Sequence, residues 1–195
     1  MTIKINLPVS EEEIRKLKIG DEVLLSGTMI TSRDMAHKLM HEEKPDFIRP
    51  YLKNSMIYHC GPVVKKHENG EYSFVAAGPT TSTREEPYQA DVIEEYQVRG
   101  VIGKGGMGPK TLAGLQKTGA VYLHAVGGLG TLLAQRIIKV KDVFKLEEFG
   151  SPEAFWIIEV KDFPVVVTMD SHGNSLHSKV LEKSMAQSEK LLAND

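Results

Sequence analysis

The sequence predicts an α/β fold in one domain over residues 1–195. Stretches with the two-residue period of strands alternate along the chain with stretches of helical period. Such alternation is typical of an α/β domain. The chain contains no internal repeat and no low-complexity linker, so we find no domain boundary in it. Hydrophobic residues make up 41% of the chain and charged residues 26%, which is ordinary for a globular protein with a sizeable core.

Local signals place the elements of the first half of the chain. Apolar and polar residues alternate from Thr2 to Leu7, and Pro8 follows them, which indicates a first strand. Ser10 and Glu13 form a capping-box pattern, which begins a helix. Gly27 interrupts a later strand, where glycine permits either a bulge or the close approach of another group. The predicted elements are strands over 2–7, 22–30, 56–60 and 72–77, helices over 11–17 and after Asp34, and a hairpin turn over 65–70.

The second half alternates in the same way. An apolar stripe indicates a helix that begins near Pro87. Pro109 suits the first position of the next helix, and Gly119 suits its end. Asp162 indicates a tight turn between the last two strands. The predicted elements are strands over 98–102, 120–125, 136–147, 155–160 and 163–169, helices over 110–117 and 178–192, and a helix-like turn over 127–135.

Charge and hydropathy exclude several classes of partner. A net charge of -2 gives no reason to expect nucleic acid. No apolar run approaches the roughly 20 residues that span a bilayer, so we expect no membrane association. The N-terminal segment MTIKINLPVSEEE lacks the apolar stretch of a signal peptide, which favours a cytoplasmic location.

Cys60 is the single cysteine of the sequence. It cannot form an internal disulfide, and alone it cannot hold a cysteine-ligated metal cluster. Any cluster ligands would have to come from another chain. Cys60 also suits the position of a small buried apolar residue near the end of a strand.

A glycine-rich loop, Gly103–Gly108, carries Lys104 between a predicted strand and a predicted helix. Backbone amides of such a loop, together with the helix N-terminus, favour an anion. The loop fits GxGxxG literally, but no acid occurs between Pro109 and Lys141 to bind a ribose, so a nucleotide is poorly supported. The alternative is a tight turn with a solvated lysine.

A run of hydroxyl residues, Thr80–Thr83, ends at Arg84. Hydroxyl donors beside a guanidinium suit a carboxylate, which arginine can hold with two parallel hydrogen bonds. The alternative is a capping cluster for the helix near Pro87. Arg33 stands just before another helix, where the dipole disfavours a cation. An arginine at this position is more easily understood if it points away from the helix at an anion. The alternative is a solvated or structural arginine, for example one paired with a nearby acid.

Histidines and acids give weaker signals. His37 and His41 are four residues apart on a predicted helix, a spacing that metals accept, but the stretch supplies no third ligand and exposure to solvent is expected. We therefore predict no metal site on this chain. His59, His124 and His172 each lie near a predicted strand end, and Glu85, Glu86, Glu94 and Glu95 are expected on solvated faces.

Six segments together carry a family resemblance. The chain contains, in this order, SGTMITSRDMAHK, IYHCGPV, AAGPTTSTRE, GVIGKGGMG, GAVYLHAVGG and VTMDSHGNSLH. In these segments it resembles the β subunit of the two-subunit class I fumarate hydratases and the similar β subunit of L(+)-tartrate dehydratase. The resemblance covers nearly the whole chain, and the GPTTSTR and GKGGMG segments are specific.

The resemblance implies a fold and an activity. The fold would be the swivelling β/β/α domain, as in the C-terminal domain of class I fumarases. The activity would be a hydro-lyase reaction, reversible hydration of fumarate to (S)-malate. Dehydration of L-tartrate to oxaloacetate is the alternative, and a non-catalytic anion-binding or assembly module is the rival from another class.

The resemblance also implies partners and residue roles. An α subunit would carry a [4Fe–4S] cluster, with no cluster bound by this chain alone, and αβ units would form a larger oligomer. Arg33, Arg84 and Lys104 would bind the dicarboxylate, and Thr80 would act in proton removal at the substrate's C3. Because a threonine hydroxyl is a poor base, an acidic neighbour from the α subunit would have to activate it.

Overall fold

The computed structural model describes residues 2–192. It confirms the α/β class. The strands are β1 (Ile3–Asn6), β2 (Glu22–Thr31), β3 (Met56–Tyr58), β4 (Val63–Lys66), β5 (Tyr72–Ala76), β6 (Gly100–Gly103), β7 (Val121–His124), β8 (Ile137–Phe144) and β9 (Phe155–Met169). The helices are α1 (Glu11–Ile14), α2 (Asp34–Glu42), α3 (Arg49–Leu52), α4 (Gln89–Tyr96), α5 (Pro109–Thr118), α6 (Gly130–Ala134), α7 (Leu146–Phe149) and α8 (Leu176–Leu192), with short 3₁₀ turns η1 (Asp46–Ile48) and η2 (Ser82–Glu85).

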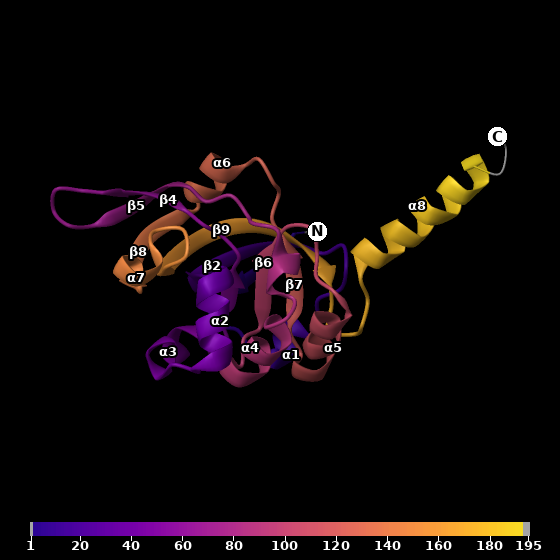
Figure 1. Cartoon of the computed structure of the whole chain (residues 1–195), viewed down its shortest axis with the longest axis horizontal. Helices are drawn as coiled ribbons and strands as arrows, with labels where there is room; N and C mark the ends of the chain where they lie inside the picture. Colours follow the sequence, from indigo (N-terminus) through magenta and orange to yellow (C-terminus); the bar gives the residue numbers. More distant parts are fainter. Residues whose placement is uncertain (1, 193–195) are drawn as a thin grey trace.

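The main sheet has the strand order β1-β2-β3-β6-β7-β9-β8 (Figure 1). Strands β1, β2, β3, β6 and β7 pair in parallel, whereas β9 runs antiparallel to β2, β7 and β8. Because β9 pairs with both β7 and β2, the sheet closes on itself. The parallel strands therefore all end at one edge of this curved sheet.

Alternate side chains of the parallel strands enter two different cores. On β7, Val121 and Leu123 face the core inside the closed sheet, and Tyr122 faces the core beneath the helices. Helices α2, α3, α4 and α5 lie together on that outer face (Figure 1). The hairpin of β4 and β5 and helix α6 lie on the other side, where Trp156 packs against Tyr72 and Phe74.

The local capping signals are confirmed. Ser10 and Glu13 form the predicted capping box, although α1 ends at Ile14 and not at Leu17. Pro109 begins α5, and Gly119 ends it with a φ of 69°, in the left-handed region that glycine adopts without a steric penalty. These boundaries place the glycine-rich loop directly between β6 and α5.

The predicted turn at Asp162 is wrong. Residues 155–169 form one continuous strand, β9, and both of its halves pair with β2. Asp162 does have a left-handed φ of 48°, but the irregularity is absorbed inside the ladder, where Gly27 lies at a bulge of β2. Pairing with a single distant strand keeps the chain extended where the local sequence favours reversal.

Helix α8 projects away from the sheet and ends far from it (Figure 1). The helix is longer than the predicted 178–192 by two residues at its start, and none of its residues is buried. None of the helices among the described residues combines the length and hydropathy that crossing a lipid bilayer requires.

Candidate functional site

The predicted site residues lie in loops that meet at the carboxyl edge of the parallel strands. Arg33 follows β2, and Lys104 follows β6. The loop that begins at Thr80 crosses the same edge, because the Lys104 amide donates to the Thr80 carbonyl at 3.1 Å and the Ser82 amide donates to the Lys104 carbonyl at 3.0 Å. The carboxyl edge of parallel strands is a common place for ligand sites in α/β proteins.

Thr80 is fixed by its backbone, and its hydroxyl has no hydrogen-bond partner within residues 2–192. Its amide donates to the carbonyl of His59 at 2.8 Å. Its Oγ1 is buried and has no hydrogen-bond partner among the described residues. A buried hydroxyl without a partner is costly, so it is a natural contact for a group that the chain itself does not supply.

Arg33 lies against Gly61 and pairs with an acid. Its Nε is 3.3 Å from Oε1 of Glu153, and both side chains are mostly buried. A Cβ placed on Gly61 would stand 2.5 Å from Nη1 of Arg33, so only glycine leaves room for the guanidinium there. The ion pair with Glu153 fixes the direction of the Arg33 side chain.

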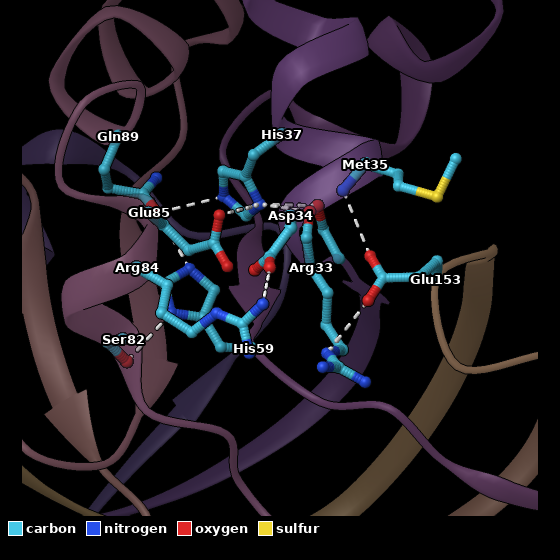
Figure 2. Close-up of polar contacts among 11 residues, drawn as sticks. Arg33, Asp34, Met35, His37, His59, Ser82, Arg84, Glu85, Gln89 and Glu153 are labelled. Atoms are coloured by element: carbon cyan, nitrogen blue, oxygen red, sulfur yellow. Dashed lines mark hydrogen bonds and ion pairs between the residues drawn. The ribbon is translucent and has the colours of Figure 1, made fainter. Parts of the chain in front are cut away.

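Arg84 forms an ion pair with Asp34, the first residue of α2 (Figure 2). Burial opposes ionisation of Asp34, but a hydrogen bond with Glu85 and the charge of Arg84 outweigh it and lower the pKa of Asp34. The Arg84 side chain remains 57% exposed. Its guanidinium is thus held by a carboxylate and still faces solvent.

Lys104 differs from both arginines. Within residues 2–192 its ammonium group forms no ion pair, and its side chain is half-buried. The loop around it is shaped by glycines, since Gly105 and Gly106 have φ values of 85° and 81°.

The helix N-terminus beside this loop is already occupied by an acid of the chain. Oε2 of Glu86 accepts hydrogen bonds from the Gly108 amide at 2.7 Å and from the Thr111 hydroxyl at 2.7 Å, and Oε1 accepts from the Thr111 amide at 3.1 Å. The N-terminus of α5 thus holds an anion, as the loop predicted, but this anion is a carboxylate of the chain itself. The prediction that Glu86 is solvated is wrong. Lys104 remains as the cation of this loop.

A buried polar cluster of His37, His59, Ser82, Gln89 and Tyr122 lies behind the hydroxyl loop. Oε1 of Gln89 is 2.8 Å from Nε2 of His59 and 3.0 Å from Nε2 of His37. Oγ of Ser82 is 2.9 Å from Nδ1 of His59 and 2.8 Å from Oη of Tyr122. These bonds join α2, the end of β3, η2, α4 and β7. Figure 2 shows His37, His59, Ser82 and Gln89.

Both histidines of this cluster are neutral at pH 7. Burial lowers the pKa of His37 to about 4 and lowers the pKa of His59 well below its ordinary value. The expected exposure of His37 is wrong, because α2 turns this face toward α4 and not toward solvent. His41, one turn later, is partly exposed and lies 3.4 Å from Asp91.

Glu85 is also buried, against the prediction of a solvated face. Its burial, the hydrogen bond with Asp34 and the nearby negative charges of Asp34 and Glu153 raise its pKa to about 9. Glu85 and Gln89 precede Val92, Ile93 and Tyr96 at helical spacing. This spacing was the signal that could have predicted burial of Glu85.

The hydroxyl run does not cap a helix. The residue before α4 is Tyr88, and the residue before η2 is Thr81, and neither makes a side-chain capping bond. Ser82 instead belongs to the buried polar cluster, and the Thr80 hydroxyl bonds to none of the described residues. The capping alternative for Thr80–Thr83 is therefore wrong.

The described residues do not fit a metal cluster. They contain no group of three or more His, Cys, Asp or Glu side chains that could hold a metal ion. Cys60 is buried, as expected of a small apolar residue, and burial raises the pKa of its thiol to about 12. A neutral buried thiol is a poor metal ligand.

The other two histidines near strand ends differ from His59. His124, at the end of β7, is partly buried, its Nδ1 has no hydrogen-bond partner among residues 2–192, and burial lowers its pKa. Nε2 of His172 lies 2.8 Å from the carbonyl of Arg15 and helps to join two loops.

Fold and site together define an α/β domain whose parallel strands end at three cations and a buried free hydroxyl. The chain belongs to the Fumarase C-terminus family, whose model matches residues 1–180. The resemblance inferred from the motifs is thereby confirmed.

Curated relatives agree with this family. The chain is 50% identical over 185 residues to a Geobacillus stearothermophilus protein named "Putative fumarate hydratase class I", with 94% of this chain and 35% of that protein covered. It is 41% identical over 178 residues to the "Putative L(+)-tartrate dehydratase subunit beta" of Methanocaldococcus jannaschii, with 90% and 91% covered. It is 38% identical over 175 residues to the L(+)-tartrate dehydratase subunit beta of Escherichia coli, with 88% and 85% covered. The chain thus spans about a third of the Geobacillus relative and most of the two β subunits.

Proposed function

We propose that this chain is the β subunit of a hydro-lyase that reversibly hydrates fumarate to (S)-malate. The observation that carries the proposal is the meeting of the loops of Arg33, Thr80 and Lys104 at one sheet edge, in a chain 50% identical to a relative named as a class I fumarate hydratase. Arg84 extends the same loop as Thr80. A dicarboxylate needs cations on two sides, and this edge offers them.

Each residue has a physical reason for its proposed role. Arg33 and Arg84 present planar guanidinium groups that can bind a carboxylate with two parallel hydrogen bonds. Lys104 adds a compact charge that no acid of the described chain neutralises. Thr80 offers a buried hydroxyl that has no hydrogen-bond partner among residues 2–192, and we assign it to the carbon that loses a proton.

In the dehydration direction, the carboxylates are fixed, a proton leaves C3 and hydroxide leaves C2. This chain would supply the carboxylate ligands and the Thr80 hydroxyl. A threonine hydroxyl does not remove such a proton unaided, so an acid from an α subunit would complete the proton path. The four residues therefore form part of a shared site.

We also propose that the α subunit carries a [4Fe–4S] cluster, since the residues described here do not fit one. The finer fold would be the swivelling β/β/α domain over residues 1–195. The αβ units would assemble into a larger oligomer in the cytoplasm, without membrane or nucleic acid.

L-tartrate is the second candidate substrate. The two relatives that this chain matches over most of their length are both named as tartrate dehydratase β subunits. Tartrate and malate share two carboxylates and a hydroxyl, so the same cations suit either. Groups of the α subunit around C2, together with Thr80 at C3, would then distinguish the two substrates.

The test is anaerobic reconstitution with the cognate α chain, followed by assays with fumarate, (S)-malate and L-tartrate side by side. We expect the isolated chain to be inactive and the complex to turn over one of the two substrate classes. Activity with tartrate alone would replace fumarate as the substrate. No turnover of either by a complex with an intact cluster would favour the non-catalytic anion-binding or assembly module.

A further inference from the structure

The buried carboxyl group of Glu85 lies directly behind the ion pair of Arg84 and Asp34 (Figure 2). It is 1% exposed, and its carboxyl group interacts with that of Asp34 closely enough to raise the pKa of Glu85 and to help lower the pKa of Asp34. Its Oε2 has no hydrogen-bond partner among the described residues and lies 3.6 Å from Nδ1 of His37. The proposed reaction assigns this buried acid no role.

The groups that face Glu85 come from three parts of the fold. Asp34 and His37 lie on α2, Arg84 precedes Glu85 in η2, and Glu153 follows α7. Burial and the two carboxylates disfavour ionisation of Glu85 and raise its pKa to about 9, which the charge of Arg84 only partly offsets. His37 is itself neutral near pH 7, because burial lowers its pKa to about 4, so it does not compensate a charge on Glu85.

We propose that Glu85 is a positioning residue, whose neutral carboxyl donates a hydrogen bond to Asp34 and so keeps Asp34 directed at Arg84. Asp34 then holds the Arg84 guanidinium at the substrate edge. The inference rests on the proposed function of Arg84 as a carboxylate ligand.

Ionisation of Glu85 would break this arrangement. The donor hydrogen would be lost, and two carboxylates would face each other in a buried position, where like charges repel strongly. Arg84 would then be drawn toward Glu85 and away from the substrate edge. Substrate affinity, and not the chemical step, should therefore weaken as the pH rises past 9.

The first test follows the proton and does not require activity. Thermal unfolding of the full chain is measured from pH 5 to 10 for the wild type and for Glu85→Gln. The folded wild type keeps a proton that the unfolded chain releases above its ordinary pKa of 4.5. The difference in Tm between the wild type and Glu85→Gln should therefore change from pH 5 to 9, with the wild type losing stability relative to the variant. Above pH 9 this difference should stay constant. Parallel curves would overturn the proposal.

The second test follows the position of Arg84. In ¹⁵N NMR spectra, the Arg84 guanidinium signal is assigned by its absence in Arg84→Lys. Glu85→Gln, which keeps a neutral donor, should leave the signal in place at pH 7, and Glu85→Ala should shift or broaden it. The control is Glu94→Gln, which removes a surface acid paired with Lys117. An unchanged Arg84 signal in Glu85→Ala would contradict the positioning role.

The third test uses the reconstituted complex. Glu85→Ala should raise KM about tenfold with kcat within about twofold, as expected when one hydrogen bond to a charged group is lost. Glu85→Gln should keep KM near that of the wild type and lose the rise in KM above pH 9. Equal losses of kcat in both variants would refute positioning. If the wild-type complex is inactive, the proposed function fails, and the unfolding and NMR tests still decide the role of Glu85.

Discussion

The Arg84 side and the Lys104 side of the candidate site are built in different ways. Arg84 is held by side chains, because Asp34 pairs with it and Glu85 stands behind Asp34. Lys104 is placed by backbone, through the bonds to Thr80 and Ser82 and through a glycine-shaped loop, and its ammonium pairs with no acid of residues 2–192. One side is held by a network of side chains, whereas the cation of the other side is positioned only through its backbone.

Loss of the preorganised cation should have the largest effect. Arg84→Ala should lower kcat/KM of the reconstituted complex, and the fall should correspond to a loss of at least about 3 kcal/mol of transition-state stabilisation. The reason is that a directed charge is removed and Asp34 is left beside the substrate. Arg136→Ala, at an exposed arginine outside the site, is the control. Near-normal kcat/KM in Arg84→Ala would break the assignment.

On the Lys104 side, which is positioned by backbone contacts, a substitution at Gly103 should destabilise the fold. A Cβ there would stand 1.9 Å from Oγ of Ser82 and 3.1 Å from Oη of Tyr122, which breaks a buried hydrogen bond as well as packing. Gly103→Ala should lower the free energy of unfolding by about 3 kcal/mol in denaturant titrations. Gly127→Ala is the matched control, since its nearest contact is an ordinary 3.7 Å. Similar stability of the two variants would show that the Ser82 side chain can move aside and contradict the prediction.

Removal of the Lys104 charge should have the smallest effect of the three substitutions, and it should lower activity without changing stability. Lys104→Met keeps the apolar part of the side chain and removes the charge. The fall in kcat/KM should correspond to a loss of about 2 kcal/mol of transition-state stabilisation. The Tm of the chain should stay unchanged, because no ion pair within the described chain is lost. A lower Tm would mean that Lys104 has a structural role that the geometry does not give it.

Much of the fold follows from local patterns. The capping box at Ser10, the proline that begins α5 and the glycine that ends it act within a few residues, so the sequence alone predicts them. The motifs likewise single out Arg33, Thr80, Arg84 and Lys104, and the fold brings their loops to one edge.

Other features depend on segments far apart in the chain. The continuous β9 exists because β2 pairs with both of its halves, and a local turn signal at Asp162 cannot report that partner. Glu85 and His37 look like solvated residues until α2 packs against η2 and α4. Glu86 looks exposed until α5 brings its unsatisfied amides to that carboxylate.

The alternation of strands and helices, the family and the four candidate residues can be read from the sequence. The acids that hold the arginines, the neutral state of the buried histidines and the occupied terminus of α5 become visible only in the folded chain. Periodicity and capping are short-range properties of the backbone, so they leave a trace in neighbouring residues. Burial, charge state and free hydrogen-bonding capacity depend instead on the neighbours that folding brings together.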